Sequence, residues 1–138
     1  MEKLTLENDI RVLCVTARSF PEGIMEAFQT LERTDPSIPG RTFYGISRMQ
    51  NGKIIYKAAA AEQYEGEAKK LGLEAFVIKK GEYLGETLHD FMKDTSVIGT
   101  TFQKLLAVPE LDQTGACVEW YKSDRDVLCM VRLNDPEK

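Results

Sequence analysis

The chain has little of what disulfide-rich, metal-binding and membrane proteins need. Its three cysteines, Cys14, Cys117 and Cys129, are odd in number and too widely spaced for a disulfide framework or a zinc site. Each lies in an apolar segment, which is typical of a small buried thiol. No apolar run reaches the length of a membrane span, and residues 1–10 alternate charged and apolar side chains without a secretory signal. We therefore expect a cytoplasmic protein that binds no metal and has no membrane partner.

The chain also has no net positive charge. The 22 acidic residues outnumber the 18 basic ones, which leaves a formal net charge of −4. Non-specific nucleic-acid binding needs a basic surface, so direct contact with nucleic acid is disfavoured and cationic partners are left open. With 43% hydrophobic and 29% charged residues, residues 1–138 are expected to form one soluble globular domain.

Hydrophobic periodicity predicts the order strand, helix, hairpin in each half of the chain. The expected strands cover residues 10–19, 42–49, 53–61, 73–78, 82–90, 116–122 and 127–133. Pro21 suits the first turn of one helix, and Asp94 or Thr95 suits the N-terminus of a second helix that runs to Val108. Asn51-Gly52 is a strong signal for a two-residue hairpin turn. The alanines at 58–61 are the weakest part of the strand prediction, because alanine disfavours strands.

The two halves resemble each other. Four residues of the first helix recur 74 positions later in the second: Ile24, Phe28, Gln29 and Leu31 match Ile98, Phe102, Gln103 and Leu105. We expect an α+β fold in which duplicated βαββ modules form a pseudo-twofold pseudo-dimer with antiparallel sheets. The modules cover about residues 10–62 and 73–133, joined by a connector at about 63–72. A central cleft between them is the expected ligand site.

Glu119 is the most unusual charged residue of the chain. It lies in the middle of an expected strand, where alternation puts it on one face with Cys117 and Tyr121, and puts Val118 and Trp120 on the other. A buried anion among apolar neighbours is costly unless a partner or ligand offsets its charge. Glu119 is therefore a candidate counter-charge in the cleft; the alternative is a solvent-facing glutamate on an open sheet face.

Aromatic residues of the expected strands supply candidate stacking walls. An anion combined with aromatic faces suits a flat cationic ligand. The residues that we expect to bind it, besides Glu119, are Tyr44, Tyr83, Trp120 and Tyr121, although the parity of Trp120 opposes that of Glu119. The alternative is that many of these rings belong to the core. His89 is the single histidine and is expected to be a surface or structural residue, and no nucleophile is recognisable, so triad chemistry is poorly supported.

Three motifs, in order, resemble the GyrI-like small-molecule-binding domain, the effector-binding domain of bacterial transcription activators. Residues 43–47 (FYGIS) resemble its tyrosine-glycine strand, residues 78–83 (IKKGEY) its I-P-A-G-x-Y entry into the second module, and residues 118–121 (VEWY) its F-E-x-Y strand. Lys79 replaces the usual proline. The resemblance covers about residues 10–133.

This resemblance implies the duplicated βαββ fold and a central cleft that takes cationic, often aromatic drugs, as in multidrug binding. It implies that Glu119 is the pocket carboxylate and that Tyr83 and Tyr121 line the same cleft. Too few residues precede Ile10 to hold a helix-turn-helix region, so we expect a stand-alone member. The heme-binding SOUL proteins share the architecture, but no histidine is suitably placed, and no cofactor is expected.

Three functions remain open at this point. The first is a sensor or sequestering domain for a small cationic molecule, with a link to transcription regulation. The second is a hydrolase of strained electrophilic genotoxins, as in some stand-alone relatives, with Glu119 as general base; the sequence leaves open whether the protein is an enzyme. The third is an interaction module whose acidic surface docks a separate DNA-binding protein.

Overall fold

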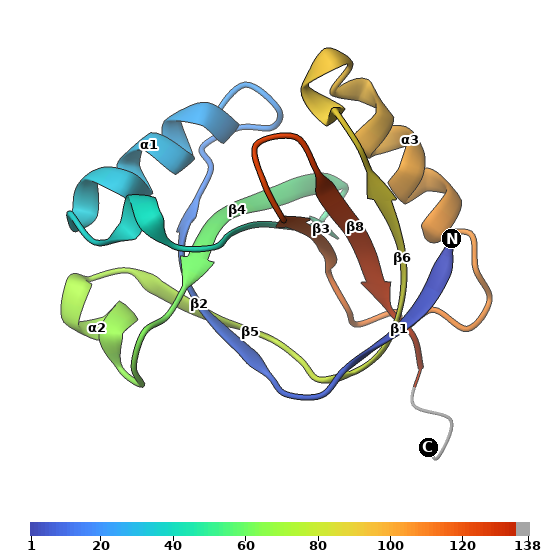
Figure 1. The fold of residues 1–138 in the computed structure, drawn as a ribbon, viewed down its shortest axis with the longest axis horizontal. Coiled ribbons are helices and arrows are strands. Elements are labelled where there is room, and N and C mark those ends of the chain that lie inside the picture. The colour runs from blue at the N-terminus through green and yellow to red at the C-terminus, as the bar shows by residue number, and fades with distance from the viewer. Residues whose placement is uncertain (135–138) are drawn as a thin grey trace. The chain divides into compact units, whose positions relative to one another are not determined.

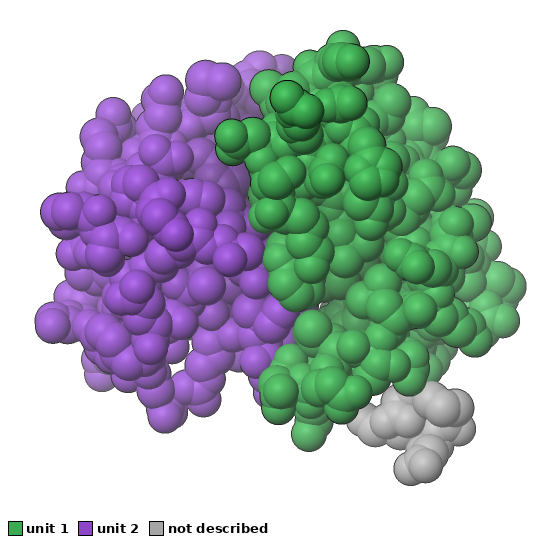
Figure 2. Space-filling model, in the orientation of Figure 1, with its two compact units in different colours: residues 1–8, 79–138 green, residues 9–78 purple. Residues whose placement is uncertain are grey.

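The computed structural model describes residues 1–134, which divide into two compact units. One unit consists of residues 9–78, and the other joins residues 1–8 to the residues from 79 onward (Figure 2). Each contains a four-stranded antiparallel sheet with a helix packed on one face (Figure 1). The α+β class and the repeated strand, helix, hairpin order expected from the sequence are thus confirmed.

The contiguous unit, residues 9–78, has the strand order β5-β2-β4-β3. Its strands are β2 (Ile10–Thr16), β3 (Phe43–Gln50), β4 (Lys53–Ala61) and β5 (Glu74–Ile78). Helix α1 (Ile24–Thr34) packs on β2 and β4, while the 3₁₀ helix η1 (Ile38–Gly40) and the short helix α2 (Glu67–Leu71) lie in the connections. Helix α2 thus lies within the connector.

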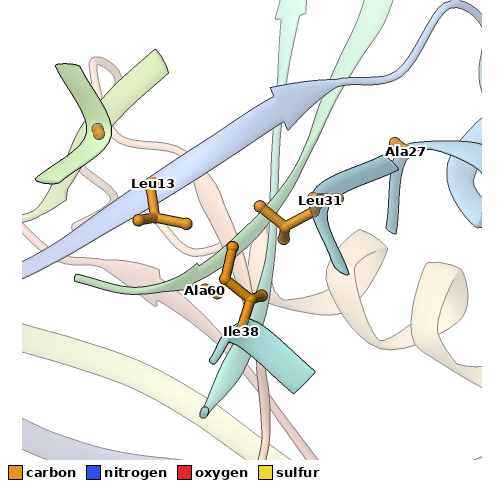
Figure 3. Packing of buried hydrophobic residues seen from close by; sticks show 7 residues of the cluster. Leu13, Ala27, Leu31, Ile38 and Ala60 are labelled. Atoms are coloured by element: carbon orange, nitrogen blue, oxygen red, sulfur yellow. The ribbon is translucent and has the colours of Figure 1, made fainter. Parts of the chain in front are cut away.

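Small side chains allow α1 to approach its sheet closely. Leu13, Ala27, Leu31, Ile38 and Ala60 form the labelled part of a cluster between helix and sheet (Figure 3). Residues 58–60, all alanine, are completely buried in β4, so their burial outweighs the weak strand preference of alanine. Burying a leucine such as Leu31 contributes about 1.5–3 kcal/mol.

The β3–β4 turn follows the sequence signal. Asn51 and Gly52 both have positive φ, 52° and 77°, the conformation that a two-residue hairpin turn requires. Helix α1 begins later than expected, at Ile24, because Pro21 belongs to the preceding turn, where its carbonyl accepts the Ile24 N–H at 3.2 Å. At the other helix, α3 (Ser96–Leu105), the Asp94 carboxylate accepts hydrogen bonds from the backbone and side chain of Ser96.

The discontinuous unit has the strand order β1-β6-β8-β7. Its strands are β1 (Glu2–Leu6), β6 (Gly81–Leu88), β7 (Cys117–Tyr121) and β8 (Val127–Arg132). Helix α3 packs on β6 and β8, and the 3₁₀ helix η2 (Phe91–Lys93) follows β6. Leu84 and Leu88 of β6 point to the α3 side, where they pack against the buried cluster.

Sequence analysis did not identify β1. This strand pairs with β6, and Leu4 lies so close over Gly85 that a Cβ there would be 2.9 Å from its Cδ2. Residues 74–78, assigned from the sequence to the second module, form β5 and pair with β2. Each unit therefore takes its outer strand from the other half of the repeat. Within residues 1–134, the helices are too short or too polar to cross a membrane.

Candidate functional site

Glu119 lies in β7 on the sheet face that carries α3. It is paired with Cys129 of β8, and its neighbours Cys117 and Tyr121 both pack into the α3 cluster. This is the alternation expected from the sequence. The residue is 7% exposed, so its carboxylate is largely removed from water. Removing an anion from water is costly, which makes its partners informative.

Tyr121 contacts this carboxylate directly. Its hydroxyl donates a hydrogen bond to Glu119 Oε1. The Tyr121 ring also packs against Phe91 of η2, with ring centroids 5.6 Å apart and planes inclined by 54°. Glu119, Tyr121 and Phe91 thus form a connected group of one carboxylate, one phenol and one apolar ring, which we call the β7 triplet.

Cys129 shows how strongly this part of the sheet is shielded. Burial, together with the nearby carboxylates of Glu119 and Glu86, raises the pKa of its thiol to about 12. A thiol with so high a pKa is not a nucleophile at neutral pH. The cysteines thus serve packing here, as their apolar surroundings in the sequence indicated.

Two contacts fasten the β7–β8 turn to the end of β6. The Phe91 N–H donates to the Arg125 carbonyl at 3.1 Å. His89 Nδ1 lies 3.0 Å from Asp126 Oδ1 in an exposed pair. The single histidine therefore lies at the surface beside a turn, in the structural position that the sequence favoured.

Two of the predicted ligand residues face away from Glu119. Tyr83 pairs with Leu4 and Arg132 on the face opposite α3, is 2% exposed and donates its hydroxyl to the Lys79 carbonyl at 2.5 Å. Trp120 is half-buried on the same opposite face, and the Lys122 ammonium lies 3.4 Å from the centre of its ring. Both rings therefore lie on the face of this sheet opposite to that of Glu119.

Tyr44 belongs to the other unit. It pairs with Ala59 in β4, on the face opposite α1, and is 3% exposed. Burial raises the pKa of its phenol. Within the discontinuous unit, the Tyr121 hydroxyl is joined to Glu119 by a hydrogen bond. Phe91 was missed because it lies in an irregular segment, where side-chain periodicity predicts no facing.

A separate hollow lies at the N-terminal end of β6, away from His89. It has a volume of about 370 Å³ and is lined by Lys3, Glu82, Glu110, Leu133 and Asn134. None of the predicted ligand residues lines it. In the described part of the chain, no three side chains of histidine, cysteine, aspartate or glutamate are grouped to hold a metal ion.

Comparison with known proteins shows similarity of fold without similarity of sequence. No protein-family model matches the chain, and no curated protein sequence matches it. An integron cassette protein from the mobile metagenome of Vibrio cholerae is similar over 96% of this chain and 95% of its own, with a TM-score of 0.65 at 14% identity.

Two further solved structures share the fold. SAV2435 bound to tetraphenylphosphonium is similar over 95% of this chain and 93% of its own, with a TM-score of 0.61 at 8% identity. A hydrolase from Listeria innocua is similar over 96% of this chain and 91% of its own, with a TM-score of 0.56 at 10% identity. The chain thus has the fold that the GyrI-like resemblance implied.

Proposed function

We propose that this protein is a GyrI-like small-molecule-binding domain that takes a cationic, partly aromatic ligand. The observation that carries the proposal is the Glu119 carboxylate of β7, which is 7% exposed and accepts a hydrogen bond from the Tyr121 hydroxyl. A ligand cation at this carboxylate offsets the cost of burying the anion. The aromatic part of the ligand gains stacking or cation–π contact of about 0.5–2 kcal/mol per ring.

Tyr121 is the aromatic partner that the geometry favours. Tyr83, Tyr44 and Trp120 lie on sheet faces opposite the helices of their own units, so their predicted ligand contacts are secondary to the Glu119–Tyr121 pair in this proposal. The SAV2435 structure supports the ligand class, because a protein of the same fold holds tetraphenylphosphonium, a permanent aromatic cation.

The biological role that we propose is that of a cytoplasmic sensor or sequestering domain. A putative bacterial transcription regulation protein from Staphylococcus aureus has a similar fold over 95% of this chain, with a TM-score of 0.55 at 9% identity. This likeness supports a link to transcription regulation through a separate protein partner. In this role, the partner protein responds to the binding of a ligand at Glu119.

Calorimetric titration with tetraphenylphosphonium tests the ligand class. We expect binding to the wild type, and a loss of about 1–3 kcal/mol in binding free energy for Glu119→Gln, which keeps the shape and removes the charge. Glu86→Gln is the matched control, because Glu86 lies on the same sheet face and is paired with Lys104. Triphenylphosphine oxide, a neutral aromatic probe, should respond little to either substitution.

Equal affinities of the wild type and Glu119→Gln for the cation would overturn the charge role. An equal loss in Glu86→Gln would show that general surface charge, rather than the Glu119 carboxylate, attracts the cation. Either result would remove the carboxylate of β7 as the recognition element.

A hydrolase is the second candidate, favoured by the Tyr121–Glu119 hydrogen bond. This pair places a proton donor beside a carboxylate that is able to act as a general base. The similar fold of a hydrolase from Listeria innocua adds support. We expect Glu119→Gln to abolish turnover of a cyclopropane-containing alkylating agent, followed by chromatography. Tight binding without turnover by the wild type would exclude the hydrolase.

A further inference from the structure

We infer that Phe91 is a positioning residue for the Glu119 carboxylate and acts through Tyr121. The inference rests on the proposed function, because it concerns the same carboxylate. Phe91 lies in η2, outside every strand of the sheet, and its ring packs against Tyr121. Its role would be to set the direction of the charge that the ligand meets.

Tyr121 links Phe91 to Glu119. Its ring packs on Phe91 at 5.6 Å, and its hydroxyl donates to Glu119 Oε1. A tyrosine side chain is a rigid ring on two rotatable bonds, so the place of the ring determines where the hydroxyl points. A shift of the ring therefore moves the hydrogen bond and the carboxylate oxygen that accepts it.

Phe91 is itself held firmly. It is 8% exposed in the α3 cluster, and its N–H donates to the Arg125 carbonyl of the β7–β8 turn at 3.1 Å. Its carbonyl accepts the Asp94 N–H at 3.2 Å. The adjacent Asp90 has a positive φ of 54°, which turns the chain from β6 into η2.

The same turn carries a second fastening two residues from Phe91. His89 Nδ1 and Asp126 Oδ1 lie 3.0 Å apart, so the end of β6 is joined to the β7–β8 turn by side chains as well as by backbone. β7 enters this turn directly after Tyr121. The segment from His89 to Phe91 is thus bonded to the β7–β8 hairpin, which carries Glu119. Within this segment, the ring of Phe91 contacts Tyr121.

Phe102 provides a matched control. It belongs to the same cluster and has the same exposure, 8%, but it is supplied by α3. Phe91→Leu and Phe102→Leu therefore make comparable losses in the core. Only the first should disturb the carboxylate, because only the first removes the ring on which Tyr121 packs at 5.6 Å.

Titration with tetraphenylphosphonium measures the effect on binding. We expect Phe91→Leu to weaken binding about two- to tenfold, the range of an aromatic pair, and Phe102→Leu to leave it unchanged. In a Glu119→Gln background the effect of Phe91→Leu should vanish, because the group being positioned is gone. Phe91→Met, whose unbranched side chain adapts to the space that the ring leaves, replaces Phe91→Leu if that variant fails to fold.

Nuclear magnetic resonance of protein labelled at the tyrosine Cζ tests the positioning without a ligand. The chain has five tyrosines, and loss of one signal in Tyr121→Phe assigns Tyr121. The Cζ shift reports the hydrogen bonding of the phenol. We expect the Tyr121 signal to move in Phe91→Leu and in Glu119→Gln, and to stay in place in Phe102→Leu.

The two measurements separate the two proposals. If Glu119→Gln loses the cation while Phe91→Leu and Phe102→Leu behave alike, the positioning role is overturned and the proposed function stands. If the wild type binds no cation, the proposed function fails and the Cζ signal decides alone. A Tyr121 signal that does not move in Phe91→Leu overturns the positioning role in either case.

Discussion

Two glutamates are buried in the described residues, and their surroundings assign them different roles. Glu67 receives both terminal nitrogens of Arg41, at 2.7 and 2.6 Å, and the Gln63 N–H at 2.9 Å. The negative charge of Glu67 is therefore neutralised within the fold by the bidentate guanidinium of Arg41. Glu119 accepts from the neutral hydroxyl of Tyr121. We therefore assign Glu67 to structure, whereas recognition by Glu119 is part of the proposed function.

Replacing Glu67 should destabilise the fold. Both side chains of the Arg41–Glu67 pair are 5% exposed, so Glu67→Gln leaves a buried guanidinium without its counter-charge. We expect a loss of about 3 kcal/mol in the free energy of unfolding, measured by chemical denaturation at pH 7. Glu65→Gln is the control: this residue is 82% exposed and forms a surface pair with Arg11, whose loss costs about 0–1 kcal/mol.

Lowering the pH should remove the stabilisation that the Arg41–Glu67 ion pair contributes. The Arg41 hydrogen bond is the main cause that lowers the pKa of Glu67 below its usual 4.5. A lowered folded-state pKa means that the unfolded chain takes up the proton first, so this stabilisation is complete above pH 4.5 and is lost as the pH falls toward the folded-state value. The stability gap between the wild type and Glu67→Gln should narrow below pH 4.5. A gap that is independent of pH would contradict the structural role of the Glu67 charge.

The sheet faces of the candidate residues were predictable where these residues lie in regular strands. Alternation in β7 correctly placed Glu119 and Tyr121 on one face and Trp120 on the other, because successive side chains of a strand must point to opposite sides. The hydrogen bond between Glu119 and Tyr121 was not predictable, since residues two apart on one face touch only if their rotamers allow it. Phe91 was not predictable either, because its segment has no side-chain period.

At the scale of elements, local signals located most helices and strands. The apolar spacing of α1 and α3 is matched by burial, for Ala27 and Leu31 in one helix and for Phe102 and Leu105 in the other. β4 shows that tertiary context prevails over intrinsic preference, because its alanines form a strand where only small side chains permit close helix packing. β1 escaped prediction because it is short and largely exposed.

At the scale of the whole molecule, two strands pair outside their own half of the repeat. β1 precedes β2 in the chain but pairs with β6, and β5 precedes β6 but pairs with β2. The two units consequently have the same strand order, with the exchanged strand on the outside of each sheet. Residues 9–78 are contiguous, whereas the unit that holds the β7 triplet needs residues 1–8 from elsewhere in the chain.

Deleting residues 1–8 should therefore weaken the unit that contains Glu119. Five residues of β1 pair with Gly81–Gly85 of β6, and Leu4 covers Gly85. Loss of the Leu4 contact alone withdraws about 1–2 kcal/mol of apolar burial. We expect faster amide hydrogen exchange in residues 81–85 and a lower free energy of unfolding. Lys3→Ala, which keeps the strand, is the control, and unchanged exchange in β6 after the deletion would contradict the pairing.

The sequence by itself determined most of the elements, their repeated order and the side-chain alternation of β7, because these depend on backbone geometry and on apolar spacing within a few residues. Only the tertiary structure decided that β1 joins β6, that β5 joins β2 and that Phe91 meets Tyr121. Strand partners and contacts from irregular segments are chosen by packing between residues far apart in the chain. No local pattern records that choice, so the surroundings of Glu119 emerged only with the fold.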